Sequence, residues 1–200
     1  MPCARRIAAL LALAAVPAGA DPAAGPLRLA DLSARLYAAG LAEGDAILIA
    51  TAARLRRDAG LPADLPGDLV PDWTAMLATA ETLAAGDPAL LDLIADLRAE
   101  TVKGIISGPE YRRAALDARA SETLPPLAFK GGDYAEVYVE AASGTDVNLT
   151  ILDAAGHVVC TDTDRSHVAY CGWTPAADGD FTVVIDNLSP IAADYALMTN

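Results

Sequence analysis

The fold of the C-terminal half is decided by residues 134–140, which read Tyr134-Ala135-Glu136-Val137-Tyr138-Val139-Glu140. Small or branched apolar residues alternate here with polar or aromatic ones, which is the period of a β-strand with one buried face. The alternation returns in residues 147–151 and 181–185, and turns rich in glycine and aspartate lie between these stretches. Several short strands separated by such turns predict an antiparallel β-sandwich.

The preceding part of the chain follows a helical period. Between residues 27 and 104, leucine and alanine recur at three- and four-residue spacing. Asp45, Asp72 and Asp87 are suited to be N-caps, and Gly40 is expected to end the first helix.

The change of period divides the chain into two segregated parts, so the expected fold class is α+β. Ser107-Gly108-Pro109 breaks the helical pattern. We expect helical hairpins over residues 27–104 and a jelly-roll-like antiparallel β-sandwich over residues 109–200.

A faint repeat lies within the helical part. Residues 44–56 match residues 86–98, and both segments begin with Gly-Asp and end with Leu-Arg. The match predicts two stacked helical-hairpin repeats. Coincidence in a sequence rich in alanine and leucine is the alternative.

Residues 1–20 have the pattern of an export signal. Arg5 and Arg6 precede an apolar run over residues 7–16, and Ala18-Gly19-Ala20 supplies the small residues that a signal peptidase requires. We expect cleavage before Asp21, by a general secretory or a twin-arginine route, and a periplasmic or secreted mature chain. A buried N-terminal helix is the alternative. Neither this run nor any later one is long enough to span a bilayer as a helix.

Two cysteines, Cys160 and Cys171, remain in the expected mature chain. In an exported protein they predict one disulfide between strands that form a hairpin or lie as near neighbours. Closing the loop between them stabilises the fold by roughly 3 kcal/mol in the chain-entropy model. Two buried free thiols are the alternative, and zinc is not expected because the chain has no C-x-x-C pair.

The chain is strongly acidic. Its formal charge is −13, and loss of the leader, which carries Arg5 and Arg6 and no acid, takes this to −15. Such a surface repels phosphate backbones, so nucleic acid is not expected as a partner.

An ordered series of short motifs in residues 109–200 resembles the bacterial pre-peptidase C-terminal domain. The series is Asp146-Val147-Asn148-Leu149, Asp153-Ala154-Ala155-Gly156, Trp173-Thr174-Pro175, Gly179-Asp180-Phe181-Thr182-Val183, Asn187 and Tyr195-Ala196-Leu197. The resemblance implies a jelly-roll-like sandwich of exported bacterial proteins, often appended to secreted peptidases and not itself catalytic. This chain departs from the family in having no preceding peptidase sequence and in carrying Asn148 where an acidic residue is typical.

The sequence contains no recognisable catalytic motif. It lacks G-x-S-x-G, H-E-x-x-H and a glycine-rich phosphate loop. Ser166 and His167 are adjacent, but neighbours in a strand point to opposite faces. We therefore expect no enzymatic activity and no cofactor.

Four aspartates are candidates for a calcium site: Asp146, Asp153, Asp162 and Asp164. Calcium prefers several oxygen ligands, and carboxylates in loops can supply them. The alternative is that they hydrogen-bond locally within turns.

The expected function is that of a non-catalytic envelope protein that binds another protein or a glycan. Tyr134 and Tyr138 would form an exposed aromatic strip suited to such binding, with ordinary cross-strand packing as the alternative. Two further hypotheses are an accessory or chaperone-like subunit of a secreted hydrolase, and a cryptic hydrolase with a dispersed site between the two parts.

Overall fold

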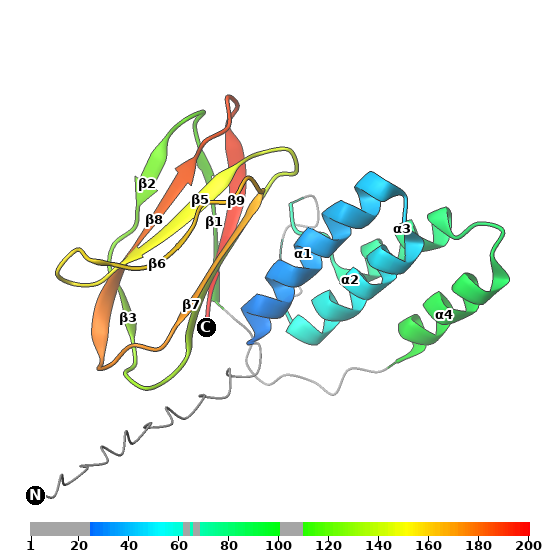
Figure 1. The fold of residues 1–200 in the computed structure, drawn as a ribbon, viewed down its shortest axis with the longest axis horizontal. Coiled ribbons are helices and arrows are strands. Elements are labelled where there is room, and N and C mark those ends of the chain that lie inside the picture. Colours follow the sequence, from blue (N-terminus) through cyan, green and yellow to red (C-terminus); the bar gives the residue numbers. More distant parts are fainter. Residues whose placement is uncertain (1–24, 62–64, 66–68, 101–109) are drawn as a thin grey trace, which may run out of the picture.

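The computed structural model describes residues 25–61, 65, 69–100 and 110–200 (Figure 1). The predicted export signal over residues 1–20 and the predicted break at Ser107-Gly108-Pro109 lie outside these residues.

The described N-terminal part contains the helices α1 (Pro26–Glu43), α2 (Ala46–Ala59), α3 (Trp73–Leu83) and α4 (Pro88–Ala99). The three predicted N-caps are confirmed, since the side chains of Asp45, Asp72 and Asp87 each accept backbone N–H groups of the following turn. Asp45 and Asp87, at matching positions of the sequence repeat, accept from the residues two and three places further on. The two segments therefore begin their helices in the same way.

The prediction that the first helix ends at Gly40 is wrong. Helix α1 continues to Glu43 and ends at Gly44, which has a left-handed backbone with φ +66°. Gly40 instead lets α2 approach closely, because a Cβ atom there would lie 2.6 Å from Cγ1 of Ile49. In the sequence, a glycine that allows two helices to approach closely cannot be told from a glycine that ends a helix.

The C-terminal part consists of the strands β1 (Glu110–Leu116), β2 (Ser121–Thr123), β3 (Leu127–Phe129), β4 (Ala135–Ala141), β5 (Val147–Leu152), β6 (Val158–Asp162), β7 (Val168–Trp173), β8 (Gly179–Asn187) and β9 (Ala193–Thr199). One sheet has the order β1-β9-β4-β7. The other has the order β2-β8-β5-β6, and β3 also pairs with β8. All the described pairings are antiparallel, as predicted for a sandwich.

The molecule has three layers (Figure 1): helix α1 packs on β4 and β7 at the outer face of the β1-β9-β4-β7 sheet, and the other helices stack on α1 in turn. One apolar core fills the sandwich and another fills the helical part. A third core lies between them, where Leu27, Ala30 and Ala34 of α1 pack on Tyr138 and Val168. Strand β4 is therefore buried along its whole length, on both faces.

The disulfide between Cys160 and Cys171 is confirmed, with the two Cα atoms 5.8 Å apart. It does not cross a hairpin, however, because β6 and β7 belong to different sheets. The bond ties the two sheets together at one edge of the sandwich. In the part of the chain that the structure describes, no helix is both long and apolar enough to cross a membrane.

Candidate functional site at the helix–sandwich junction

The most buried polar contact between the two parts is an ion pair between Arg56 on α2 and Glu140 on β4. The two Nη atoms of Arg56 donate to the two oxygens of Glu140 at 2.7 and 3.1 Å. The Tyr138 hydroxyl also donates to Glu140, at 2.6 Å, and Nε of Arg56 donates to the Ser33 hydroxyl. Burial and the charge of Glu140 raise the pKa of Tyr138 well above its usual value, so this hydroxyl keeps its proton.

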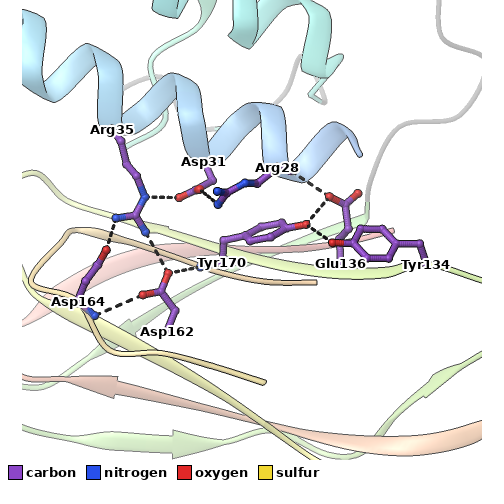
Figure 2. A network of polar contacts seen from close by, with 8 residues as sticks. All are labelled: Arg28, Asp31, Arg35, Tyr134, Glu136, Asp162, Asp164 and Tyr170. Atoms are coloured by element: carbon purple, nitrogen blue, oxygen red, sulfur yellow. Dashed lines mark hydrogen bonds and ion pairs between the residues drawn. The ribbon is translucent and has the colours of Figure 1, made fainter. Parts of the chain in front are cut away.

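A second group of charges joins α1 to the loop between β6 and β7 (Figure 2). Asp31 is completely buried and accepts from Arg28 and Arg35, in both cases at 2.6 Å. Arg35 also reaches the sandwich, donating to Asp162 at 3.0 Å and to Asp164. Burial raises the pKa of Asp31, so desolvation outweighs the attraction of the two guanidinium groups. We therefore expect this group to orient α1 on the sandwich more than to stabilise it.

Figure 2 also shows the contacts of Glu136 on β4. Its Oε1 accepts the backbone N–H of Arg28 at 3.0 Å and the hydroxyl of Tyr170 at 2.9 Å. The hydroxyls of Tyr170 and Tyr134 lie 3.1 Å apart. Gly25, the N-cap residue of α1, has no side chain for capping. A carboxylate of the sandwich thus takes the place of a side-chain cap at the positive end of this helix.

The aspartates predicted as calcium candidates do not come together as one site. Asp162 and Asp164 lie on Arg35, whereas Asp153 accepts backbone N–H groups of its own turn. Asp146 lies just before β5, and its Oδ1 is buried without a hydrogen-bond partner. Within the described residues, no group of three or more His, Cys, Asp or Glu side chains is arranged to hold a metal ion. Calcium binding stays a prediction.

Leu41 of α1 lines two hollows, one beside the junction and one within the helical part. The first, of about 210 Å³, has Tyr37, Leu69 and Pro71 in its wall, together with the polar residues Glu140, Ser143 and His167. The second, of about 370 Å³, lies between α1 and α3, where Ala78, Thr79, Thr82 and Leu83 line it. Leu41 is 48% exposed and Leu83 is 43% exposed. We call this apolar region, on both sides of Leu41, the Leu41 surface.

His167 contributes the one imidazole of the Leu41 surface. Its ring has no hydrogen-bond partner among the described residues, and burial lowers its pKa from 6.5, which favours the neutral form. The adjacent Ser166 hydroxyl accepts the N–H of Val168 at 3.2 Å. Among the residues that the structure describes, no serine or cysteine is hydrogen bonded to a histidine. The junction therefore presents no assembled nucleophile and base there.

The predicted aromatic strip of Tyr134 and Tyr138 is wrong, because Tyr138 is completely buried under the helices. The strand period places Tyr138 on the outer face correctly but does not reveal that another layer covers this face. No motif marked Arg35 and Arg56 as partners of acids on the strands. The one signal that could have found them is that both are arginines within helices rich in alanine and leucine.

The described residues thus define an α+β protein in which helices pack on an antiparallel β-sandwich. The sequence matches no protein-family model and no curated protein.

Solved structures similar to part of this chain include the pre-peptidase C-terminal domain of a collagenase from Bacillus anthracis. The identity is 8% and the TM-score 0.37, over 46% of this chain and 89% of that one. This likeness, over the β-half, is the one that the sequence motifs predicted.

Two further similar structures are a periplasmic inhibitor and a carbohydrate-binding module. One is a periplasmic inhibitor of g-type lysozyme from Aeromonas hydrophila, with 9% identity and a TM-score of 0.34 over 51% of this chain and 93% of that one. The other is a carbohydrate-binding module of a Cellvibrio mixtus lichenase in complex with cellotriose. The identity is 15% and the TM-score 0.32, over 47% of this chain and 87% of that one.

Proposed function

We propose that this chain is a non-catalytic binding protein of the bacterial envelope, and that it holds a protein partner on the Leu41 surface. One observation carries the proposal, namely that two hollows adjoin at Leu41, a leucine that is 48% exposed. Hollowed apolar surface is unfavourable in water and is typical of sites where a partner inserts apolar side chains.

The chemistry of this surface favours a protein over a glycan. Its walls are mainly leucine, alanine, proline and threonine, and the hydroxyl of Tyr37 already faces Thr79 at 3.4 Å. The aromatic strip that would have suited a glycan is absent from the described surface, because Tyr138 is buried. His167 adds one unpaired ring that could donate to or accept from a polar group of the partner.

The envelope location rests on the export signal expected over residues 1–20, and the disulfide between Cys160 and Cys171 supports it. The non-catalytic character is supported by the junction itself. Its charged groups are engaged with one another, Arg56 with Glu140 and Arg35 with Asp31.

The test compares three forms of the mature, oxidised protein, immobilised and exposed to envelope extract of the source cells. Besides the wild type, one form carries Leu41→Glu. The matched control carries Val158→Glu, which places the same charge at an apolar residue 60% exposed on β6, away from the Leu41 surface. Circular dichroism and thermal unfolding check that each form is folded.

We expect the wild type and the Val158→Glu form to retain the same protein in stoichiometric amount. Retention by Leu41→Glu should fall about ten-fold, the change that ~1.4 kcal/mol of lost contact free energy produces. Equal retention by all three forms would exclude the Leu41 surface. Retention of glycan alone, or of nothing, would contradict a protein-binding function, and turnover in a hydrolase panel would contradict the non-catalytic one.

A further inference from the structure

The two long edges of the sandwich are closed differently. Strands β7 and β6 lie at the same end of the two sheets, and the disulfide joins them there. Strands β1 and β2 lie at the opposite end. The sheet edge is interrupted on that side, because β2 ends at Thr123 and β3, which pairs with the same strand β8, begins at Leu127. Between them, Pro125 and Pro126 have no N–H to donate to a neighbouring strand.

A hollow of about 290 Å³ opens at this interrupted edge. Its lining is mainly apolar and includes Leu124, Pro125, Leu127 and Leu197. Leu124 and Leu197 belong to the core of the sandwich and are only 4% and 5% exposed. The hollow therefore reaches from the surface to the apolar layer between the two sheets. Its volume is close to the ~300 Å³ at which pockets for small ligands begin.

Arg112 of β1 is the one charged residue in the described lining of this hollow. Its Nη2 donates to Glu122 of β2 at 2.5 Å, and Glu122 also accepts from the Tyr195 hydroxyl at 2.7 Å. Glu122 thus holds the guanidinium across the open edge. Nε and Nη1 of Arg112 have no hydrogen-bond partner among the residues described, and the side chain is 48% exposed. Most of the five N–H donors of this guanidinium are therefore available to a ligand.

An apolar hollow beside a guanidinium suits a ligand with an apolar body and a negatively charged group. Alkyl groups gain free energy by leaving water for the leucine side chains. The planar guanidinium matches a carboxylate, which can accept two parallel N–H bonds. Glu122 lies beside Arg112, and the chain has a formal charge of −13, so one negative charge on the ligand is repelled less than the two of a phosphate monoester.

We propose that this hollow is a binding site for a short alkyl carboxylate. The alkyl chain lies against Leu124, Leu127 and Leu197, and the carboxylate accepts from Arg112. The site is separate from the Leu41 surface, because no residue lines both.

The test uses octanoate as the probe and the oxidised, folded protein. Octylamine, octanol and octyl phosphate are compared with it, all below the concentrations at which they form micelles. NMR titration of the leucine methyl groups locates each ligand and gives its Kd. Arg112→Gln removes the charge at the hollow. Arg54→Gln is the matched control, since Arg54 is 61% exposed and lies on α2 in the helical part.

We expect octanoate to shift the methyl signals of Leu124, Leu127 and Leu197. Arg112→Gln should weaken the binding of octanoate about ten-fold, to the level of octanol, because the charge-assisted hydrogen bonds are lost. Arg54→Gln should bind octanoate as the wild type does. Octylamine should bind to the wild type more weakly than octanoate, because its charge is repelled by the guanidinium.

The proposal would be overturned if octanoate left these three leucines unshifted, or if octylamine bound as tightly as octanoate. Tighter binding of octyl phosphate would overturn the assignment to carboxylates. These comparisons use the wild type, so they decide the matter even if Arg112→Gln does not fold. None of them involves an envelope partner, so the result is independent of the function proposed for the Leu41 surface.

Discussion

Arg56 on α2 and Glu140 on β4 form a two-bond ion pair in which each side chain is only 2% exposed. The pair joins residues that are 84 positions apart in the sequence. It is the one polar link between the helices and the sandwich, among those that the structure describes, in which both side chains are removed from water. The two parts of the chain should therefore unfold together.

Removing one partner of this pair should strongly destabilise the protein. Arg56→Leu leaves Glu140 charged and buried, and the expected loss is about 3–5 kcal/mol of unfolding free energy. Replacing both residues with Met should cost less than Arg56→Leu alone, because no lone charge then remains. Urea unfolding measures the two variants. Arg54→Ala is the control on the same helix, since Arg54 is 61% exposed and 3.9 Å from Asp58. A single-variant loss no larger than that of the control would contradict the prediction.

The disulfide should be coupled to the Arg35 contacts. Asp162 and Asp164 lie within the loop that Cys160 and Cys171 close, so the bond holds both acids in place for Arg35. Replacing both cysteines with Ala should cost roughly 3 kcal/mol. Arg35→Ala should then cost less in the cysteine-free chain than in the oxidised one, with an interaction energy of about 0.5 kcal/mol or more.

A double-mutant cycle by urea unfolding measures this coupling. Arg98→Ala serves as the control, because Arg98 pairs with Glu81 inside the helical part, away from the disulfide. We expect the effect of Arg98→Ala to be the same with and without the cysteines, within ~0.5 kcal/mol. If the effects of Arg35→Ala and of the cysteine replacements were strictly additive, the loop that carries Asp162 and Asp164 would keep its place without the disulfide.

Gly40→Ala should destabilise the helical part even though alanine is the better helix former. The new Cβ would lie 2.6 Å from Ile49 Cγ1 and 3.1 Å from the Ile49 backbone nitrogen, so α1 and α2 must move apart. Overpacking of this kind costs typically about 1–3 kcal/mol, more than the ~1 kcal/mol gained in helix propensity. Thermal unfolding measures the effect. In an Ile49→Ala background, which removes Cγ1, the cost of Gly40→Ala should shrink, and an unchanged cost would place the clash elsewhere.

His167 should make stability fall in mild acid. Burial lowers its pKa from 6.5; Glu140 opposes this shift, and Arg56 and Arg35 add to it. Because the folded-state pKa is lowered, the contribution of the neutral ring is present above the ordinary pKa. This contribution is lost as the pH falls from the ordinary pKa to the lowered one, because in that range only the unfolded chain readily takes up the proton.

His167→Gln should therefore flatten the decrease in Tm on going from neutral pH to mild acid. His157→Gln is the control, because the ring of His157 is 79% exposed and lies in a turn with Asp153. We expect the control to keep the wild-type slope. If the two variants behave alike, titration of His167 does not contribute to the acid sensitivity.

The features that could be predicted from the sequence are those that depend on neighbours along the chain. Asp45, Asp72 and Asp87 were identifiable as N-caps because each bonds N–H groups two or three residues away. Longer strands such as β4 and β5 were visible in their alternation. Strands β1, β2 and β3 were not, because β1 carries two arginines at its centre and β2 and β3 have three residues each.

By itself, the sequence determined the two periods, the positions of the helix starts, and the face of β4 on which Ala135, Val137 and Val139 lie. The tertiary structure decided what covers the opposite face, where Glu136, Tyr138 and Glu140 are buried beneath helices. It also decided that β6 and β7 lie in different sheets. The physical reason is that local periodicity reports only which side a residue points to. Whether a charged residue on that side meets water or an arginine depends on a partner distant in the sequence, such as Arg56 for Glu140.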